Sequence, residues 1–230
     1  MGYSDLILAH PNLVSYWTLN GIWTDSKGSN NLTNNGAVFS SPGKKEPQCA
    51  SYDGIDDYDA TGNTGFAFGT GGFTVELWGQ VRVNASVTYD TFIDIGGTTN
   101  GVRLLWYNDG SYGNQLQFII AGTNIEKVWL PSINTWYHMV ALRTGTTARI
   151  YIDTVQLGAD AASSGNIQPS ANVYLGYNTE SGDYHLNGLL GDVAVYNAAL
   201  TEAEIASHFN YVESATRIRR MLSFGVSDEW

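Results

Sequence analysis

Residues 72–83 read GFTVELWGQVRV, and the alternation within this stretch decides the fold class. Because successive side chains of a β-strand point to opposite faces of a sheet, a period of two leaves one face of the strand apolar. The apolar face here carries Phe73, Val75, Leu77, Gly79, Val81 and Val83. The pattern therefore predicts a strand that packs one face against a core.

Similar short runs recur along the whole chain, and each is bounded by Gly, Asn, Asp or Thr. With 26 Gly and only 5 Pro, the sequence offers many tight turns and few helical segments. Many short strands between tight turns predict an all-β jelly-roll sandwich of two antiparallel sheets. The further runs are 12–19, 91–97, 101–107, 115–122, 136–143, 148–158, 172–178 and 189–197.

One short C-terminal helix interrupts this rhythm over residues 198–209. Thr201 is its predicted N-cap, and Glu204 three positions later completes a capping box. Leu200 precedes the cap and is placed to pack against Ile205. We therefore expect a single domain over residues 1–209 that ends in this helix.

Residues 210–230 form a tail of different character. It carries basic and bulky apolar side chains at the end of an acidic domain. The tail either packs on its own domain or docks on a neighbouring subunit. The docking residues expected in the second case are Arg217, Arg219, Arg220, Phe224 and Trp230.

Charge and composition exclude several classes of function. The net charge of −11 and pI of about 4.5 argue against nucleic-acid binding, because phosphate backbones select for Lys and Arg. No apolar run reaches membrane-spanning length, so no membrane insertion is expected. Cys49 is the only cysteine, and therefore no intrachain disulfide can form. The first residues lack the basic and apolar regions of a secretory signal.

Several ordered motifs carry a family resemblance. The motifs are YWTLNGIWTDSKGSNNLTNNG (16–36), SYDGIDDYDATG (51–62), GGFTVELWGQV (71–81), NTWYHMVALRTGTTARIYIDTVQLG (134–158) and LNGLLGDVAVYNAALTEAEI (186–205). Together they resemble laminin-G-like and pentraxin-like domains of the concanavalin A-like lectin/glucanase class. The resemblance implies two curved antiparallel sheets. Asp153-Thr154 departs from the family's Asp-Gly, so we expect this hairpin to turn differently, because Thr is strained at positive φ.

The resemblance also implies a structural calcium ion that ties the opening loop to the closing strand. Asp25, Asn30 or Asn31, and Asp192 are its expected ligands, although Gly191 replaces the first of two consecutive acids common in the family. Carboxylate and carbonyl oxygens are the ligands that calcium prefers. The acids at Asp53, Asp56, Asp57 and Asp59 are interpreted mainly as turn residues that cap the local backbone.

Aromatic residues beside Asn and Asp are the candidate ligand contacts, because sugar rings stack on aromatic faces and their hydroxyls bond to amides and carboxylates. The core is expected to take Trp17, Trp78 and Trp136. The predicted ligand-binding residues are Trp106, Tyr107, Asn108, Asp109, Asp183 and Tyr184.

No catalytic residues are predicted. Glycan-cleaving jelly rolls use two carboxylates on one strand face. Glu76 and Asp94 are the nearest candidates, but neither has a second acid two positions away. A non-enzymatic protein is therefore expected.

Three functions remain open at this point. The opening YSDLILAHPNLVSYW resembles laminin-G-like proteins of bacteriophage particles, which implies a virion surface protein, assembled in the host cytoplasm, that contacts other virion proteins and binds cell-surface glycans. The alternative is a free, calcium-assisted, extracellular lectin. A glycoside-cleaving enzyme is the third and least favoured reading.

Overall fold

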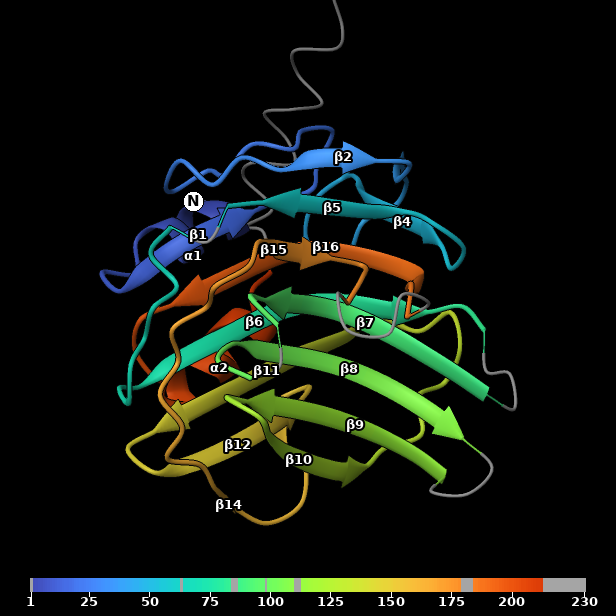
Figure 1. Ribbon diagram of the computed structural model, residues 1–230. Helices are drawn as coiled ribbons and strands as arrows, with labels where there is room; N and C mark the ends of the chain where they lie inside the picture. Colours follow the sequence, from blue (N-terminus) through green and yellow to red (C-terminus); the bar gives the residue numbers. More distant parts are fainter. Residues whose placement is uncertain are drawn as a thin grey trace, which may run out of the picture.

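Two antiparallel sheets face each other in the computed structural model, which describes residues 2–62, 64–83, 87–97, 99–109, 113–178 and 184–212 (Figure 1). The nine-stranded sheet A runs β13 (Val155–Gln156), β12 (Thr147–Ile152), β11 (Tyr137–Thr144), β6 (Phe73–Val81), β16 (Asn187–Tyr196), β4 (Cys49–Asp53) and β3 (Val38–Ser40). In the same sheet, β1 (Leu13–Trp17) pairs with β16, and β14 (Ala161–Ala162) pairs with β12.

The seven-stranded sheet B lies in front of sheet A in Figure 1. Its order is β10 (Thr123–Val128), β9 (Gly113–Ile120), β8 (Val102–Asp109), β7 (Val87–Ile95), β15 (Val173–Leu175), β5 (Tyr58–Thr61) and β2 (Thr33–Asn35). The predicted all-β sandwich is confirmed. No helix among the described residues is long and apolar enough to cross a membrane.

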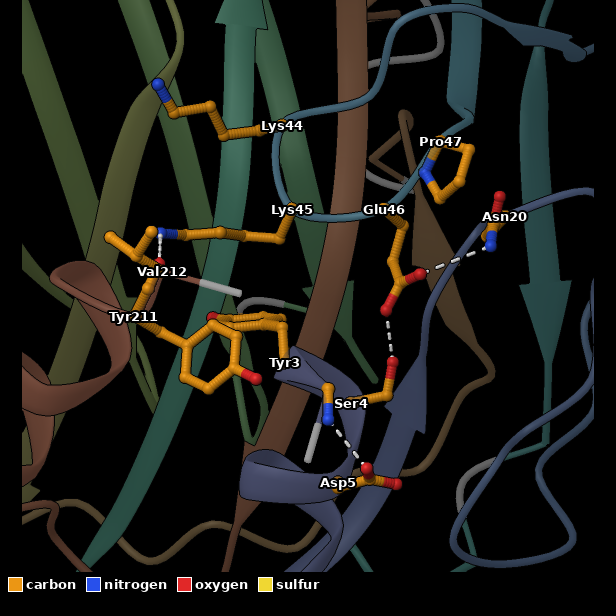
Figure 2. A pocket seen from close by; sticks show the side chains of 11 residues that line it. Tyr3, Ser4, Asp5, Asn20, Lys44, Lys45, Glu46, Pro47, Tyr211 and Val212 are labelled. Carbon is orange, nitrogen blue, oxygen red and sulfur yellow. Dashed lines mark hydrogen bonds between the residues drawn. The ribbon is translucent and has the colours of Figure 1, made fainter. Parts of the chain in front are cut away.

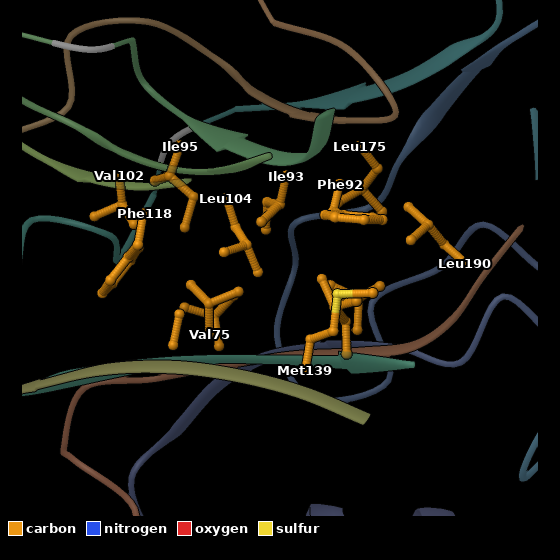
Figure 3. Close-up of a cluster of buried hydrophobic side chains, with 14 of the residues drawn as sticks. Val75, Phe92, Ile93, Ile95, Val102, Leu104, Phe118, Met139, Leu175 and Leu190 are labelled. Atoms are coloured by element: carbon orange, nitrogen blue, oxygen red, sulfur yellow. The ribbon is translucent and has the colours of Figure 1, made fainter. Parts of the chain in front are cut away.

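The main core fills the space between the sheets. Val75 and Met139 rise from sheet A, while Ile93, Leu104 and Phe118 descend from sheet B (Figure 3). Of the predicted apolar face, Phe73, Val75, Leu77 and Val81 lie in this core, whereas Val83 follows the end of β6 and is 40% exposed. The opposite face of β6 is buried as well, because two helices cover the outer side of sheet A.

Helix α2 (Glu202–Phe209) begins where the capping box predicts. The Thr201 hydroxyl accepts a hydrogen bond from the Glu204 N–H at 3.2 Å, and the Glu204 carboxylate accepts one from the Thr201 N–H at 2.7 Å. Leu200 and Ile205 are both buried in the cluster beneath the helix.

A second helix, α1 (Tyr3–Leu8), precedes β1, whereas only one helix was expected. Six residues are too few to display a helical period, and Gly2 at the N-cap has no side chain to mark the start. Tyr3 and Ile7 join Trp78 and Tyr196 in the cluster on the outer side of sheet A.

The hairpin between β12 and β13 corrects another expectation. Asp153 and Thr154 have φ of 49° and 76°, so the left-handed turn is kept although Thr replaces the usual Gly. Ile152 pairs with Val155 across this two-residue turn, which matches the twist of a hairpin. The fold therefore holds Thr154 in a conformation that β-branched residues disfavour.

Candidate ligand-binding groove

A polar groove of about 390 Å³ lies on the outer face of sheet B, where β2, β5 and β15 lie side by side (Figure 1). Below it is called the tyrosine groove. Its lining residues are Asn31, Thr33, Asn35, Tyr58, Ala60, Thr61, Gly62, Asn172 and Tyr174.

Strand register explains the hollow. Thr33, Ala60 and Tyr174 are direct partners across the three strands, so they form one row on the outer face. Asn35 and Tyr58 form the next row. Ala60 is small, and therefore it forms a low floor between larger neighbours.

The aromatic side chains of the groove are half-buried and continue beyond its edge. The Tyr58 and Tyr174 ring centroids are 5.9 Å apart and inclined at 55°. Tyr177 packs on Tyr58 at 5.4 Å, and His185 stacks on Tyr177 at 4.7 Å. Rings fixed in this way offer aromatic surface with little ordering needed on binding.

A buried carboxyl group supports the groove from below. Asp59, which lies between Tyr58 and Ala60, points into the sandwich and accepts hydrogen bonds from the Tyr52 hydroxyl at 2.6 Å and from Asn34 at 3.0 Å. Burial raises the pKa of Asp59 to about 6, against the lowering effect of these two hydrogen bonds. The bond to Asn34 joins the edge strand β2 to β5, and it therefore fixes the wall of the groove.

The groove suits uncharged polar ligands. Tyrosine rings supply apolar faces, while Asn and Thr side chains both donate and accept hydrogen bonds. Among the described residues, none that lines the groove is charged.

Four of the predicted ligand-binding residues lie elsewhere on sheet B, in strand β8 rather than in a loop: Trp106, Tyr107, Asn108 and Asp109. Trp106 is 0% exposed and belongs to the main core, where its indole N–H donates to the Trp129 carbonyl at 3.2 Å. The expectation for Trp106 is therefore corrected, because a ring without exposed surface cannot stack on a ligand. Asn108 and Asp109 pair with Asn114 and Gly113 on β9.

Tyr107 and Tyr184 do share one cluster on the outer face of sheet B. Tyr184 stacks on Tyr89 at 4.1 Å with the rings 7° from parallel, and Tyr89 stacks on Tyr107 at 5.7 Å. Much of their aromatic surface is thus covered by one another. Asp183 lies outside the described residues, as do the predicted docking residues Arg217, Arg219, Arg220, Phe224 and Trp230.

The three residues predicted to bind calcium already make protein contacts. The Asp25 carboxylate accepts from the backbone N–H groups of Tyr16 and Lys27 at 3.0 Å and of Asn30 at 3.2 Å. Asp192 instead accepts from the Tyr16 hydroxyl at 2.6 Å. The two carboxyl groups therefore lie at opposite ends of Tyr16.

Asp192 and Asn30 are likewise engaged within the protein. Burial raises the pKa of Asp192 well above its ordinary value, although the Tyr16 hydrogen bond favours the charged form. The Asn30 amide donates to the Ser15 hydroxyl at 2.8 Å and to the Thr64 carbonyl. Calcium at these three residues stays a prediction from the family resemblance.

The acidic turn after β4 behaves largely as expected of turn residues. The Asp53 carboxylate accepts from the Ile55 N–H at 2.8 Å, and Asp57 accepts from the Asp53 N–H at 3.0 Å. Ligand oxygens of Asp53, Asp56 and Asp57 all lie within 4.8 Å of one another, so this part of the described chain could hold a metal ion.

Neither candidate catalytic carboxylate opens onto a groove. Glu76 is buried beneath α2, where it contacts His138, His208 and Tyr196. Burial alone would raise the pKa of Glu76, but the hydrogen bonds from His138 and His208 outweigh it and hold that pKa far below its usual range. Asp94 is fully buried and pairs with Arg103 at 2.9 Å.

A second hollow of about 570 Å³ lies between α1, the 44–47 loop and the segment after α2 (Figure 2). The Lys45 ammonium donates to the carbonyls of Phe209 at 2.7 Å and Tyr211 at 3.0 Å. Glu46 bonds to Ser4 and Asn20 on the opposite wall. Most of the polar groups drawn in Figure 2 are thus engaged with one another.

Comparison with known proteins defines the class. Residues 53–206 match the family model described as the concanavalin A-like lectin/glucanases superfamily. The chain belongs to this family. No curated protein sequence matches it.

Several solved structures share the fold. Domain 4 of a GH43 extracellular arabinanase from Geobacillus stearothermophilus, solved with arabinotriose, has a TM-score of 0.63 at 17% identity, over 86% of this chain and 98% of that one. A Trypanosoma rangeli sialidase has a TM-score of 0.64 at 15% identity over 88% of this chain, which spans only 33% of the sialidase. The binding domain of Paraclostridial Mosquitocidal Protein 1 has a TM-score of 0.66 at 15% identity, over 86% of this chain and 52% of that one. At these identities the likeness shows the fold alone.

Proposed function

We propose that the protein is a non-catalytic carbohydrate-binding domain whose ligand occupies the tyrosine groove. The observation that carries the proposal is the groove itself, in which Tyr58 and Tyr174 rings stand among amide and hydroxyl side chains. Aromatic surface combined with such groups is the chemistry that shallow sugar sites require. The arabinotriose complex of the arabinanase domain supports a sugar ligand on this fold.

The two carboxylates that the sequence offers as catalytic candidates, Glu76 and Asp94, do not support cleavage. A retaining glycosidase places its two carboxyl groups ~5 Å apart at an accessible site, and an inverting one ~6.5–9.5 Å apart. Glu76 and Asp94 lie on different sheets, and both are buried. The fold is also found in chains of a sialidase and an arabinanase, which are enzymes. A test for glycan cleavage therefore belongs with the binding test.

A glycan array followed by calorimetry tests the proposal. The Ala60→Leu variant fills the floor of the groove and should weaken binding at least tenfold. Ala162→Leu is the matched control, because Ala162 is exposed on sheet A and the same side chain is added there. Unchanged binding by Ala60→Leu, or release of reducing ends from the bound glycan, would contradict the proposal.

The virion surface role is a narrower proposal that depends on the tail. Its support is the sequence of residues 213–230, which combines three Arg residues with apolar ones, next to a domain of net charge −11. Deleting 213–230 keeps the contacts of Lys45 with Phe209 and Tyr211. The truncated protein should therefore fold normally but should not be incorporated into virions. Incorporation at the wild-type level would contradict this role.

A further inference from the structure

The charges around the tyrosine groove suggest which sugars it accepts. We propose that the groove binds uncharged glycans and rejects glycans that carry carboxylate or sulfate groups. This inference rests on the proposed function and specifies its ligand class. Its basis is the absence of cationic side chains among the described lining residues, together with a cluster of acids beside the turn that follows the lining residue Asn35.

A cluster of acids lies at the β4–β5 turn, beside the turn that ends β2. Asp57 lies against Gly36, which is next to the lining residue Asn35 and has no side chain to separate them. Asp53 and Asp56 lie within 4.8 Å of Asp57 through their carboxylate oxygens. A ligand carboxylate near Asn35 would therefore meet like charges.

On the β7 side of the groove, the described cation that strand register brings near is Arg103, and it is buried and paired. Asp94 is the direct ladder partner of Tyr174, and Arg103 pairs with Asp94 in the next position across the sheet. Arg103 is 3% exposed, and its guanidinium is 2.9 Å from the Asp94 carboxylate. Recognition of an acidic sugar normally uses an accessible Arg or Lys, because a desolvated carboxylate needs a charged partner.

Neutral hydroxyl and acetamido groups of a sugar would instead find hydrogen-bond donors and acceptors in the groove. The Asn31, Asn35 and Asn172 amides and the Thr33 hydroxyl can each donate or accept, so they match sugar hydroxyls in either role. The net charge of −11 adds a general repulsion of anions that weakens as salt is added.

Calorimetry with paired oligosaccharides tests the inference. Each neutral oligosaccharide that binds is compared with the same chain after oxidation of one sugar to its uronic acid. The wild-type protein should bind the neutral form at least tenfold more tightly at low salt. The Thr33→Lys variant puts a cation on the exposed rim of the groove and should narrow this difference about tenfold.

Thr123→Lys is the matched control, because the same change is made at an exposed position on β10, at the opposite edge of the same sheet. It should leave the preference unchanged. Equal or tighter binding of the acidic form by the wild type, sensitive to Ala60→Leu, would overturn the charge selection while the proposed function stands. Glycan binding that ignores Ala60→Leu, or no glycan binding at all, would overturn both.

Discussion

His208 on helix α2 lies 2.9 Å from the Glu76 carboxylate on strand β6, and this contact fastens the helix to sheet A. His138 approaches the same carboxylate at 2.7 Å, and the Tyr196 hydroxyl donates to it at 2.6 Å. A buried acid is thus surrounded by three partners from β11, β16 and α2. The charge that Glu76 retains is available to stabilise a protonated His208.

The first prediction concerns the pH dependence of this contact. Burial lowers the pKa of His208, but the hydrogen bond and charge of Glu76 raise it above the ordinary ~6.5. The resulting stability is complete below the unfolded-state value and is lost as pH rises through the higher folded-state value. His208→Gln should therefore cost about 2 kcal/mol of unfolding free energy at pH 6 and clearly less at pH 9. Urea unfolding at both pH values measures this difference.

The control is Asn210→Ala at the end of the same helix, because the Asn210 side chain donates to the Ala206 carbonyl and carries no titratable group. Its effect on the free energy of unfolding should not vary with pH in this way. An equal loss at pH 6 and pH 9 for His208→Gln would show that the charge of His208 is not involved.

The second prediction concerns Asp90, a buried acid on β7 with a different partner. One oxygen accepts from the Asn187 N–H at 2.6 Å, and the other has no hydrogen-bond partner among the residues that the structure describes. Burial raises the pKa of Asp90 to about 7, despite the lowering effect of the Asn187 bond. Asp90 ionises near pH 4 in the unfolded chain but only near pH 7 in the folded protein. The free energy of unfolding therefore falls as pH rises between these two values.

Asp90→Asn should remove this loss. Relative to wild type, the variant should gain about 2 kcal/mol of unfolding free energy between pH 5 and pH 8. Thr91→Val, at the neighbouring buried position on β7, changes no titratable group; it serves as the control and should show no such pH-dependent gain. If the free energy of unfolding varied with pH in the same way in wild type and Asp90→Asn, the raised pKa of Asp90 would be contradicted.

The third prediction concerns Arg143, whose guanidinium is buried without a carboxylate partner among the described contacts. It donates to the carbonyls of Gly69 at 2.8 Å, Gly71 at 2.7 Å and Gly165, and so joins two loops. Arg143→Lys keeps the charge, but a single ammonium cannot reproduce the planar fork. A loss of about 3 kcal/mol in unfolding free energy is expected by urea titration. Arg149→Lys, at a solvent-exposed pair with Asp160, should cost clearly less than Arg143→Lys, because water screens that pair.

The fourth prediction concerns the strained hairpin residue Thr154. Glycine adopts φ near the observed 76° without steric strain, so Thr154→Gly should stabilise the protein by about 0.5–1 kcal/mol. Thr147→Gly in β12 is the control, and it should destabilise by a similar amount because glycine weakens strands. Thermal unfolding of both variants gives the comparison, and a lower melting temperature for Thr154→Gly would contradict the strain.

The sheets and helix α2 could be predicted because their signals are local. Alternation along 72–83 depends on neighbours two positions apart, and the Thr201–Glu204 cap lies within one helical turn. Helix α1 gave no comparable signal, since its single packed face depends on Trp78 and Tyr196 far along the chain.

The error at Trp106 has a physical cause that the sequence also contains. Trp106 is in phase with Val102 and Leu104, which places it on the core face, although the polar residues after it look like a loop. The tyrosine groove could not be predicted in the same way. Tyr58 and Tyr174 meet only because β5 pairs with β15, and no local pattern reports a pairing between segments so far apart.

The pocket in Figure 2 brings together the two ends of the described chain. The Tyr3 and Tyr211 rings are 5.8 Å apart, and the Lys45 ammonium donates to the carbonyl of Phe209, the last residue of α2. A domain whose chain ends lie close together can be inserted into a surface loop of another protein without distorting that loop. It can also be circularly permuted if a short connector joins the two ends. Neither described helix covers sheet B, so a connector across this spot would lie on the other side of the sandwich from the tyrosine groove.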